Sequence, residues 1–258
     1  GHGLPFDSDG MKERYPGVFF SQFTGAELVA DKWNLSREDL DEFALESHQK
    51  AANATESKYF DREILPVEGK NAEGINELVL ADEGIRFDAS LDKLAGLKPV
   101  TDGGVITAGN ASQITDGAAA VMICNDAGLK KIQSNPRAEI VSISVVGDDP
   151  VFMLTGPIPA SKKALEAAGL SIDDMDLYEV NEAFAPVPLA WAHDLEADKS
   201  KLNVNGGAMA LGHPLGATGA KLMTTMLHEL ERRNGNYALQ AICEGGGTAN
   251  ATIIKRLS

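Results

Sequence analysis

Cysteine is scarce in this sequence: Cys124 and Cys243 are the only two among 258 residues. Two thiols are too few for a disulfide framework or for a zinc site with four cysteine ligands. The sequence also lacks the uninterrupted apolar run of roughly 18 to 20 residues that crosses a bilayer, and its first twenty residues lack the basic start and apolar run of a signal peptide. We therefore expect a cytoplasmic protein with no membrane partner, whose cysteines remain available for thiol chemistry.

Basic side chains are outnumbered: 23 Lys and Arg stand against 38 Asp and Glu, which gives a formal net charge of −15. Because acidic surfaces repel phosphate backbones, we expect no nucleic-acid partner. Aromatic residues are also few, at 6%, but 43% of the residues are hydrophobic. That share is close to the globular average and predicts a folded core rather than a disordered chain.

The first 110 residues or so are polar and rich in charge. A first helix is expected over residues 24–33, and Ser36 with Asp39 predicts a capping box at the start of a second helix over 37–57. The spacing of Leu40, Phe43 and Ala44 predicts that one face of this second helix is buried. Residues 58–105 show no regular pattern and are interpreted as an irregular insertion.

From residue 138 onward, strand and helix patterns alternate. The order βαβαβαββ predicts an α/β fold class, with a mixed sheet covered by helices. We expect a buried strand over 138–146, helices over 160–168 and 182–195 and from about 217, and strands over 177–180, 202–204, 237–243 and 249–255.

Three polar or glycine-rich loops follow predicted strands, at residues 180–184, 203–219 and 243–247. Ligands of open α/β sheets bind beyond the carboxyl ends of the strands, so the three loops could meet at one site. His213 lies between a glycine and a proline, ahead of a predicted helix whose positive end favours a neutral imidazole, as a general base requires. A loop histidine that only forms hydrogen bonds is an equal alternative. We expect the other four histidines to lie at the surface: His2, His48, His193 and His228.

Cys243 ends an apolar strand and is followed by Glu244 and three glycines. A thiol in such a place is ordinarily an inert core residue, but consecutive glycines leave backbone N–H groups free to bind a developing oxyanion. Cys124, in an apolar run, is interpreted as a core thiol. Asn181 precedes a predicted helix, so its default role is an N-cap.

Together, these residues resemble the thiolase family along essentially the whole chain. The matching motifs are GNAS at 109–112, TGPIPA at 155–160, NEAFA at 181–185, NGGAMALGHPLGATGA at 205–220 and CEGGG at 243–247. The resemblance implies two similar βαβαβαββ halves, of which this chain contains one complete copy, plus a loop domain inserted in the first half. Residues 1–114 then correspond to the loop domain, 115–134 to the end of the N-terminal half and 135–258 to the C-terminal half.

The resemblance also implies a reversible Claisen condensation through an acyl-cysteine. His213 resembles the base that activates the nucleophilic cysteine and helps to bind the thioester oxygen. Cys243 resembles the second cysteine, which moves the proton of the carbon nucleophile or of the leaving thiolate. Asn181 resembles the residue that holds a water in the first oxyanion hole, and the N–H of Gly245 a donor of the second. A thiolate attacks a thioester far better than a thiol, and an oxyanion needs donors already aimed at it.

The binding side of the resemblance rests on four residues. Ser112 resembles the serine that contacts the pantetheine arm of CoA, and Met153, Ala183 and Phe184 resemble residues near the acyl and pantetheine pocket. The implied partners are acyl-CoA, acetyl-CoA and CoA, with a homodimer or homotetramer as the assembly. No metal ion and no cofactor other than the CoA thioesters is implied.

One departure concerns the nucleophile. The family's nucleophilic cysteine lies upstream of the loop domain, and no residue of this chain can replace it. We therefore expect no thiolase turnover from this polypeptide alone, which would be a piece of a longer chain or one chain of a two-chain enzyme. A second departure is Ser21-Gln22-Phe23, where acetyl-specific members carry His-Met; this change favours longer or branched acyl groups.

Two other functions remain open at this stage. A ketoacyl-ACP synthase shares the fold, but it pairs its nucleophile with two histidines or with His and Asn, whereas this chain offers His213 and Cys243. A non-catalytic, CoA-binding subunit is the other alternative, and it predicts CoA binding without turnover.

Overall fold

The computed structural model describes residues 5–70 and 73–257. Its centre is a four-stranded mixed sheet in the order β3-β6-β5-β4. β4 runs parallel to β5, whereas β6 is antiparallel to both β5 and β3. The strands are β3 (Ala138–Gly147), β4 (Leu177–Val180), β5 (Tyr237–Cys243) and β6 (Thr248–Arg256). This is the α/β architecture with a mixed sheet that the sequence predicts.

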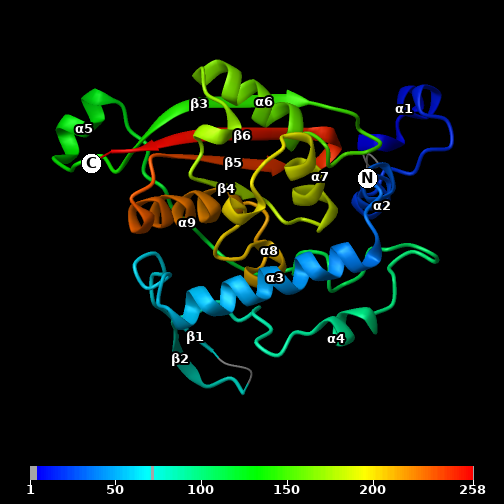
Figure 1. Ribbon diagram of the computed structural model, residues 1–258, viewed down its shortest axis with the longest axis horizontal. Helices are drawn as coiled ribbons and strands as arrows, with labels where there is room; N and C mark the ends of the chain where they lie inside the picture. The colour runs from blue at the N-terminus through cyan, green and yellow to red at the C-terminus, as the bar shows by residue number, and fades with distance from the viewer. Residues whose placement is uncertain (1–4, 71–72, 258) are drawn as a thin grey trace.

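Helices cover both faces of this sheet (Figure 1). On one face lies α6 (Pro157–Ala168), which begins with a proline and ends at Gly169 in the left-handed conformation. The hydroxyl of Ser144 on β3 donates to the carbonyl of Ala160 at 2.6 Å, so α6 lies directly on this strand. On the other face lies α9 (Thr218–Arg233), whose Met226 and Leu230 pack against β4 and β5. Two hydrophobic layers thus hold the sheet in place.

A third layer, formed by residues 37–95, lies beyond α9 (Figure 1). Its long helix α3 (Arg37–Glu56) begins at the predicted capping box, in which Ser36 accepts from the Asp39 N–H and the Asp39 carboxylate accepts from the Ser36 N–H. The predicted apolar face is buried: Leu40 and Ala44 are fully enclosed. The remaining elements are α1 (Asp9–Arg14), α2 (Gln22–Lys32), β1 (Val67–Lys70), β2 (Asn76–Val79), α4 (Leu91–Ala95), α5 (Asp126–Ile132), α7 (Pro186–Asp194), α8 (Ala208–Leu211) and the 3₁₀ turns Pro5–Asp7, Ile172–Asp174, Lys199–Lys201 and Gly245–Gly247.

Three predicted elements are wrong in position or kind. The strand predicted as buried, β3, is an edge strand that exposes Ile143 and Val145, because in the described part of the chain it pairs only with β6. The helix predicted from residue 182 begins at Pro186, since residues 183–185 bond to another loop instead of to each other. Residues 202–204 form single β-bridges, because Asn203 has a φ of 44° that interrupts an extended strand.

The apolar run around Cys124 also differs from its prediction. Cys124 is exposed, as are Met122 and Ile123, and residues 112–125 form no helix or strand. An extended apolar segment is buried only when neighbouring strands or helices cover it, and the described residues provide none here. Cys124 is therefore not a core thiol in this structure.

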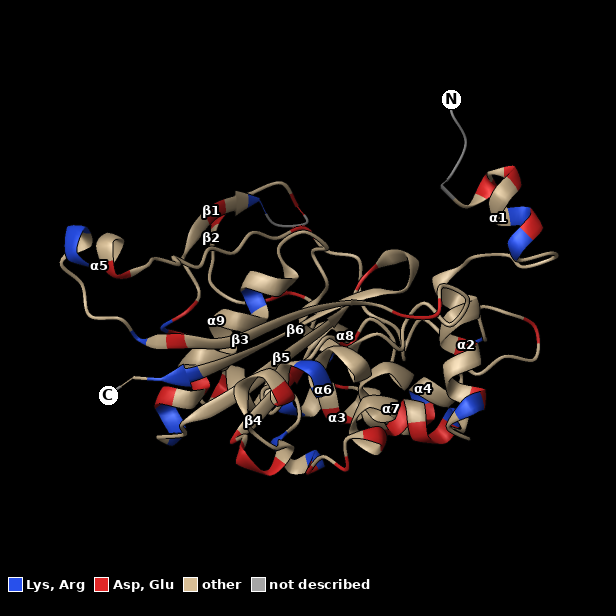
Figure 2. Cartoon of the chain, turned by 90° about the horizontal axis from the view of Figure 1, so that it is seen from above, with Lys and Arg blue, Asp and Glu red and all other residues tan. Residues whose placement is uncertain are grey.

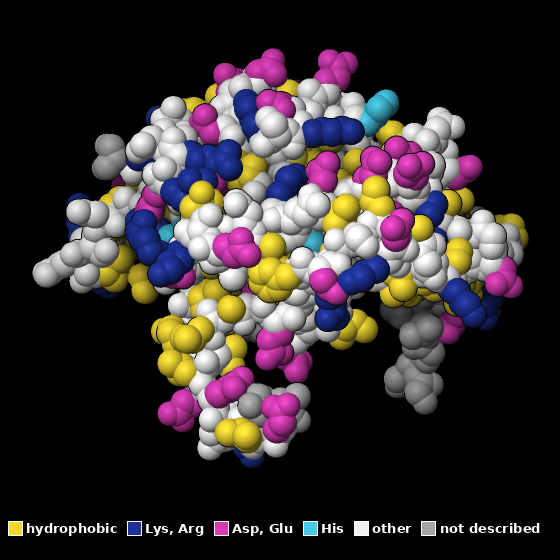
Figure 3. Space-filling view, turned by 60° about the horizontal axis from the view of Figure 1, so that its bottom comes forward, with side chains coloured by type: hydrophobic (Ala, Val, Ile, Leu, Met, Phe, Trp, Pro, Cys, Tyr) yellow, Lys and Arg dark blue, Asp and Glu magenta, His cyan; other side chains and the backbone are white. Residues whose placement is uncertain are grey.

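The surface carries mixed charge and a few apolar areas. Figure 2 shows both signs on the short helices α1 and α5, in keeping with scattered rather than clustered basic residues. Figure 3 shows hydrophobic side chains on the projecting β1–β2 hairpin, where Val67 and Leu78 are about half exposed. Across the described ranges, no helix has both the length and the apolar character needed to cross a membrane.

The capping box of α3 provides a stability test. Replacing Ser36 with alanine removes a hydroxyl that accepts from Asp39 N–H at 3.2 Å. We expect Ser36→Ala to lower the free energy of unfolding by about 1 kcal/mol, the usual loss for an N-cap serine. Urea denaturation followed by circular dichroism measures the change. Ser57→Ala, at the exposed C-terminal end of the same helix, is the matched control, and equal stabilities of the two variants would contradict the capping role.

Candidate functional site

Two of the predicted catalytic side chains meet at the end of β4. Asn181 directly follows this strand, and its backbone N–H donates to the carbonyl of Ala241 on β5 at 3.0 Å. The Asn181 amide nitrogen Nδ2 lies 3.5 Å from Nε2 of His213, which comes from the glycine-rich loop. Asn181 is therefore not an N-cap, because α7 begins five residues later and its N-cap is Ala185. The Asn181 amide, on the loop after β4, therefore faces the His213 imidazole, on the glycine-rich loop.

His213 is fixed by two hydrogen bonds and by the conformation of the glycine before it. Its backbone N–H donates to the carbonyl of Gln113 at 3.0 Å, and its ring Nδ1 lies 2.6 Å from Oγ1 of Thr218, the first residue of α9. The preceding Gly212 has a φ of 84°, and a Cβ there would lie 2.4 Å from Thr115. Only glycine fits such a close approach at a positive φ. The loop can therefore hold His213 in this place only if residue 212 is glycine.

Cys243 lies at the end of the neighbouring strand. Because β4 and β5 are parallel, with Val180 opposite Ala241, the residues that follow β4 lie beside the end of β5. Gly246 and Gly247, just beyond, both have positive φ values of 77° and 83° and form a tight turn with Gly245. The structure thus brings Cys243 and Gly245 to the same sheet end as Asn181.

Glu244 turns away from this cluster toward its own hairpin. Its carboxylate accepts hydrogen bonds from Asn250 Nδ2 at 2.5 Å and from Thr248 Oγ1 at 3.3 Å. These bonds hold the charge at the exposed side of the turn. The acidic residue in the CEGGG motif is therefore bonded within its own hairpin, and its charge still acts on the adjacent Cys243.

The predicted binding residues form a second group. The backbone N–H of Ser112 donates to the carbonyl of Ala183 at 3.0 Å, and Ala111 forms an antiparallel bridge with Phe184. The Phe184 ring packs edge-on against Phe23 from α2, with 5.3 Å between the ring centroids. The loop at 109–112 and the loop at 181–185 thus form one unit, which α2 covers.

Met153 belongs to the same buried cluster as Ala183 and Phe184. It is 3% exposed and has a φ of 60°, a conformation that is uncommon for a residue with a side chain. Backbone strain of this kind is maintained only where the surroundings enforce it. Here Gly25 of α2 packs closely against the carbonyl oxygen of the adjacent Phe152, which a Cβ at position 25 would approach to 2.5 Å.

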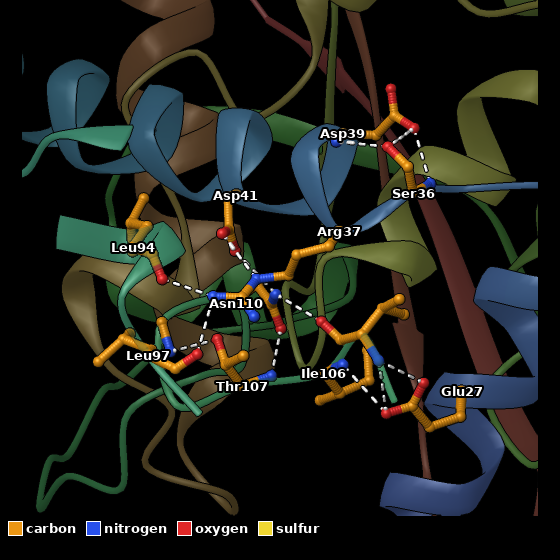
Figure 4. Close-up of polar contacts among 12 residues, drawn as sticks. Glu27, Ser36, Arg37, Asp39, Asp41, Leu94, Leu97, Ile106, Thr107 and Asn110 are labelled. Carbon is orange, nitrogen blue, oxygen red and sulfur yellow. Dashed lines mark hydrogen bonds and ion pairs between the residues drawn. The ribbon is translucent and has the colours of Figure 1, made fainter. Parts of the chain in front are cut away.

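Asn110 anchors the Ser112 loop to the rest of the protein (Figure 4). The sequence pattern did not indicate this role. Its Nδ2 donates to Asp41 on α3 and to the carbonyl of Val105, each at 3.0 Å, and its Oδ1 accepts from Thr107 N–H at 2.8 Å. Arg37 Nε in turn donates to Asp41 at 2.7 Å. This fully buried amide therefore fixes the loop to the long helix of the outer layer. Sequence spacing could not reveal it, because Asp41 lies far away along the chain.

Glu182 is a second residue that the sequence analysis missed as a structural centre. Its buried carboxylate accepts from the Ser47 hydroxyl at 2.7 Å, from Asn203 Nδ2 at 2.9 Å and from the Met209 N–H at 3.1 Å. Burial raises the pKa of Glu182, although these three donors act in the opposite direction. Its three partners lie on α3, on α8 and on the loop that follows α7. This one side chain therefore connects the elements around Asn181 and His213.

Burial keeps the two candidate proton carriers neutral. It lowers the pKa of His213, so the imidazole remains uncharged and can accept a proton. It raises the pKa of Cys243 to about 12, with a smaller contribution from the negative charge of Glu244. Where the structure describes the chain, no group of three or more His, Cys, Asp or Glu side chains is arranged to hold a metal ion.

A cavity of about 330 Å³ adjoins the Ser112 loop. Gly109 and Gln113 of that loop line it, together with Arg86 and Lys93. His48, predicted at the surface, also lines this cavity and is buried, with its Nδ1 accepting the Arg86 N–H at 3.0 Å. His193 is exposed as predicted, His228 is mostly buried, and His2 lies outside the described residues.

The raised pKa of Cys243 predicts a difference in thiol reactivity. Alkylating reagents attack the thiolate, which is a minute fraction of a group with a pKa of about 12 at pH 8. We expect iodoacetamide to modify exposed Cys124 at least tenfold faster than Cys243, and Cys243 labelling to rise as the pH rises toward its pKa. Mass spectrometry of the two cysteine peptides over time measures both rates, and equal rates at pH 8 would contradict the burial of Cys243.

Comparison with known proteins places this geometry in a family. Residues 8–127 match the N-terminal domain of thiolase and residues 134–256 match its C-terminal domain. A steroid 3-ketoacyl-CoA thiolase of Mycobacterium tuberculosis is 54% identical over 244 residues, which cover 95% of this chain and 58% of the relative. The chain thus spans less than two thirds of that relative's length.

Solved structures agree with the sequence matches. The crystal structure of human mitochondrial 3-ketoacyl-CoA thiolase superposes with a TM-score of 0.87 at 46% identity, covering 91% of this chain and 59% of that one. The Bacillus anthracis acetyl-CoA acetyltransferase gives a TM-score of 0.88 at 41% identity, covering 94% of this chain and 61% of that one. The paired loops around Asn181 and His213, the matched domains and these relatives together show that the chain belongs to the thiolase family.

Proposed function

We propose that this chain supplies the base, the oxyanion donors and much of the CoA site of an acyl-CoA C-acyltransferase, a thiolase that forms or cleaves 3-ketoacyl-CoA. The observation that carries this proposal is the 3.5 Å approach of Asn181 to Nε2 of a half-buried His213. Next to it, the Ser112 loop is bonded to the loop that carries Ala183. An imidazole, an amide and a binding loop at one sheet end suit acyl transfer.

In the proposed reaction, His213 Nε2 takes the proton of a nucleophilic cysteine that lies outside this chain. The resulting thiolate attacks the thioester, and the C–S bond to CoA breaks to leave an acyl-cysteine and CoA thiolate. Cys243 donates a proton to that thiolate and later removes one from the α-carbon of the second acyl-CoA. The carbanion attacks the acyl-cysteine carbonyl, a C–C bond forms as the C–S bond to the cysteine breaks, and His213 returns its proton to the cysteine thiolate. The water held by Asn181 and the N–H of Gly245 stabilise the oxyanions.

CoA binding is assigned to the loop pair and the neighbouring cavity. Ser112, Met153, Ala183 and Phe184 contact the pantetheine and acyl parts. Arg86, Lys93 and Asp88 line the cavity beside this loop; Lys93 is paired with Asp88, and the positive charge of Arg86 suits the phosphates of CoA. The proposed partners are acyl-CoA, acetyl-CoA and CoA, with no cofactor beyond these thioesters.

The apolar surface left uncovered by the described residues supports an assembled protein. Ile143 and Val145 of β3 are 60% and 63% exposed, and Met122 is 77% exposed. Apolar patches of this kind ordinarily mark an interface. We propose that the whole protein is a homodimer or homotetramer, and that it acts in the cytoplasm.

A hybrid protein tests the proposed activity. It joins this chain to the part of the M. tuberculosis relative that the chain does not cover, and its thiolytic cleavage of 3-ketoacyl-CoA is followed by loss of absorbance. We expect turnover by the hybrid and none by the 258-residue chain. We expect His213→Ala in the hybrid to lower kcat/KM by about 10²- to 10⁴-fold, the usual contribution of a general base.

The controls separate this proposal from the alternatives. His193→Ala, at an exposed histidine, should leave the hybrid's rate unchanged. Robust turnover by the intact chain alone would contradict the assignment of the nucleophile to another segment. A folded hybrid that binds CoA but transfers no acyl group would instead support the non-catalytic subunit.

The residues at the start of α2 predict the length of the acyl chain. Phe23 packs on Phe184 where acetyl-specific thiolases carry His-Met, and the mycobacterial relative is named as a steroid thiolase. We expect the hybrid to cleave longer or branched 3-ketoacyl-CoAs faster than acetoacetyl-CoA. Comparing kcat/KM for the two substrate classes measures this preference, and a strict preference for acetoacetyl-CoA would overturn it.

A further inference from the structure

Thr218 contacts His213 at the ring nitrogen that points away from Asn181. Thr218 Oγ1 lies 2.6 Å from Nδ1, whereas Asn181 Nδ2 lies 3.5 Å from Nε2. Each nitrogen of the imidazole therefore has one polar neighbour. A neutral imidazole carries a proton on only one nitrogen, and its hydrogen-bonding partners determine which nitrogen that is.

Both neighbours favour the same protonation. In the structure the Asn181 amide turns Nδ2 toward the ring, and its buried Oδ1 has no hydrogen-bond partner among the described residues. In this orientation the amide nitrogen can only donate, so it requires a lone pair on Nε2. The Thr218 hydroxyl can direct its own proton to the Pro214 carbonyl at 3.2 Å, which leaves its oxygen to accept from Nδ1–H. The two contacts are mutually consistent only with a proton on Nδ1 and a free lone pair on Nε2.

We propose that Thr218 is a positioning residue that holds His213 in the Nδ1–H form, so that Nε2 faces the thioester site as the base. When Nε2 takes up a proton, Nδ1–H continues to donate to the Thr218 hydroxyl and the imidazolium keeps a partner. The role of Nε2 as a base rests on the proposed function, whereas the position of the proton does not.

Helix capping does not account for this contact. The N-cap of α9 is Ala217, and the bond from the Thr218 hydroxyl to the carbonyl four residues back is repeated farther along α9, where Thr224 donates to Ala220 at 2.8 Å. What distinguishes Thr218 is its contact with the imidazole. Because Thr218 is 2% exposed, water cannot easily replace its hydroxyl.

The charged groups around His213 do not determine which of its ring nitrogens carries the proton. Burial is the one cause of its lowered pKa. On the neighbouring elements, Cys243 stays a thiol with a pKa raised to about 12, and Lys221 on α9 is paired with Asp82 at 3.7 Å. Glu182, beside β4, is bonded to three donors, and the pKa of buried Glu179 on β4 is raised by burial.

NMR of the ¹⁵N-labelled chain tests the proposal directly. Long-range ¹H–¹⁵N spectra separate protonated from unprotonated ring nitrogens. His48 is an internal reference, because its contacts favour the opposite tautomer. Its Nδ1 accepts the Arg86 N–H, so its proton lies on Nε2. We expect neutral His213 to show the reverse pattern, with the proton on Nδ1.

Thr218→Val then removes the acceptor while keeping the shape of the side chain. A buried Nδ1–H without a partner is unfavourable, most of all in the imidazolium. We expect the proton to shift toward Nε2 and the pKa of His213 to fall by about one unit or more, a loss of at least about tenfold in proton affinity. Thr218→Ser should restore both, and Thr224→Val, which removes the equivalent helix bond, should leave both unchanged.

Three results would overturn the proposal: an Nε2–H pattern for His213 in the unaltered chain, an unchanged pattern and pKa in folded Thr218→Val, or failure of folded Thr218→Ser to restore them. Circular dichroism establishes folding, and the measurement on the unaltered chain decides the outcome if Thr218→Val does not fold. Because the spectra need no turnover, an inactive hybrid would contradict the proposed function and leave the Thr218 result standing.

Discussion

The site depends on the burial of one carboxylate. Glu182 is 1% exposed, and it accepts hydrogen bonds from α3, from the loop after α7 and from the start of α8. An ionisable group enclosed in this way is tolerated only if donors surround it, so each of the three elements must be in place. That requirement fixes the loop after β4, and with it Asn181. The position of the amide relative to the imidazole is thus a consequence of satisfying a neighbouring buried acid.

Asn110 plays the corresponding part on the binding side. Its amide connects the Ser112 loop to Asp41, while the loop backbone pairs with residues 183–185. The proposed binding residues therefore belong to the same framework as the proposed catalytic ones, with α3 contributing to both through Ser47 and Asp41. Loops held by buried polar bonds of this kind can present donors with little rearrangement, which is what stabilising an oxyanion requires.

Local signals in the sequence were sufficient for much of the fold. The capping box at Ser36, the end of α6 at Gly169 and the strand β4 depend on neighbouring residues, and all three agree with the structure. Errors arose where distant contacts decide the outcome. Nothing in the spacing around Cys124 shows whether another strand covers it, and Pro186 sets the start of α7 because residues 183–185 pair with a loop some seventy positions earlier. The loops around His213, Cys243 and Asn181 were identified from their motifs, but Asn110, Glu182 and Thr218 gained their roles only from three-dimensional contacts. The catalytic assignments themselves stay predictions.

The contact between Gly207 and Glu182 limits how this site can diverge. A Cβ at position 207 would lie 2.3 Å from the Glu182 carboxyl carbon, so no larger residue fits while the glutamate is present. Shortening the glutamate first would free that space but would remove the acceptor of the Ser47 hydroxyl and of the Met209 N–H, and one of the two acceptors of the Asn203 amide. Neither residue can therefore change first without a penalty. The pair is epistatic, and descendants of this sequence would have to cross a fitness valley, or alter several positions together, to replace it.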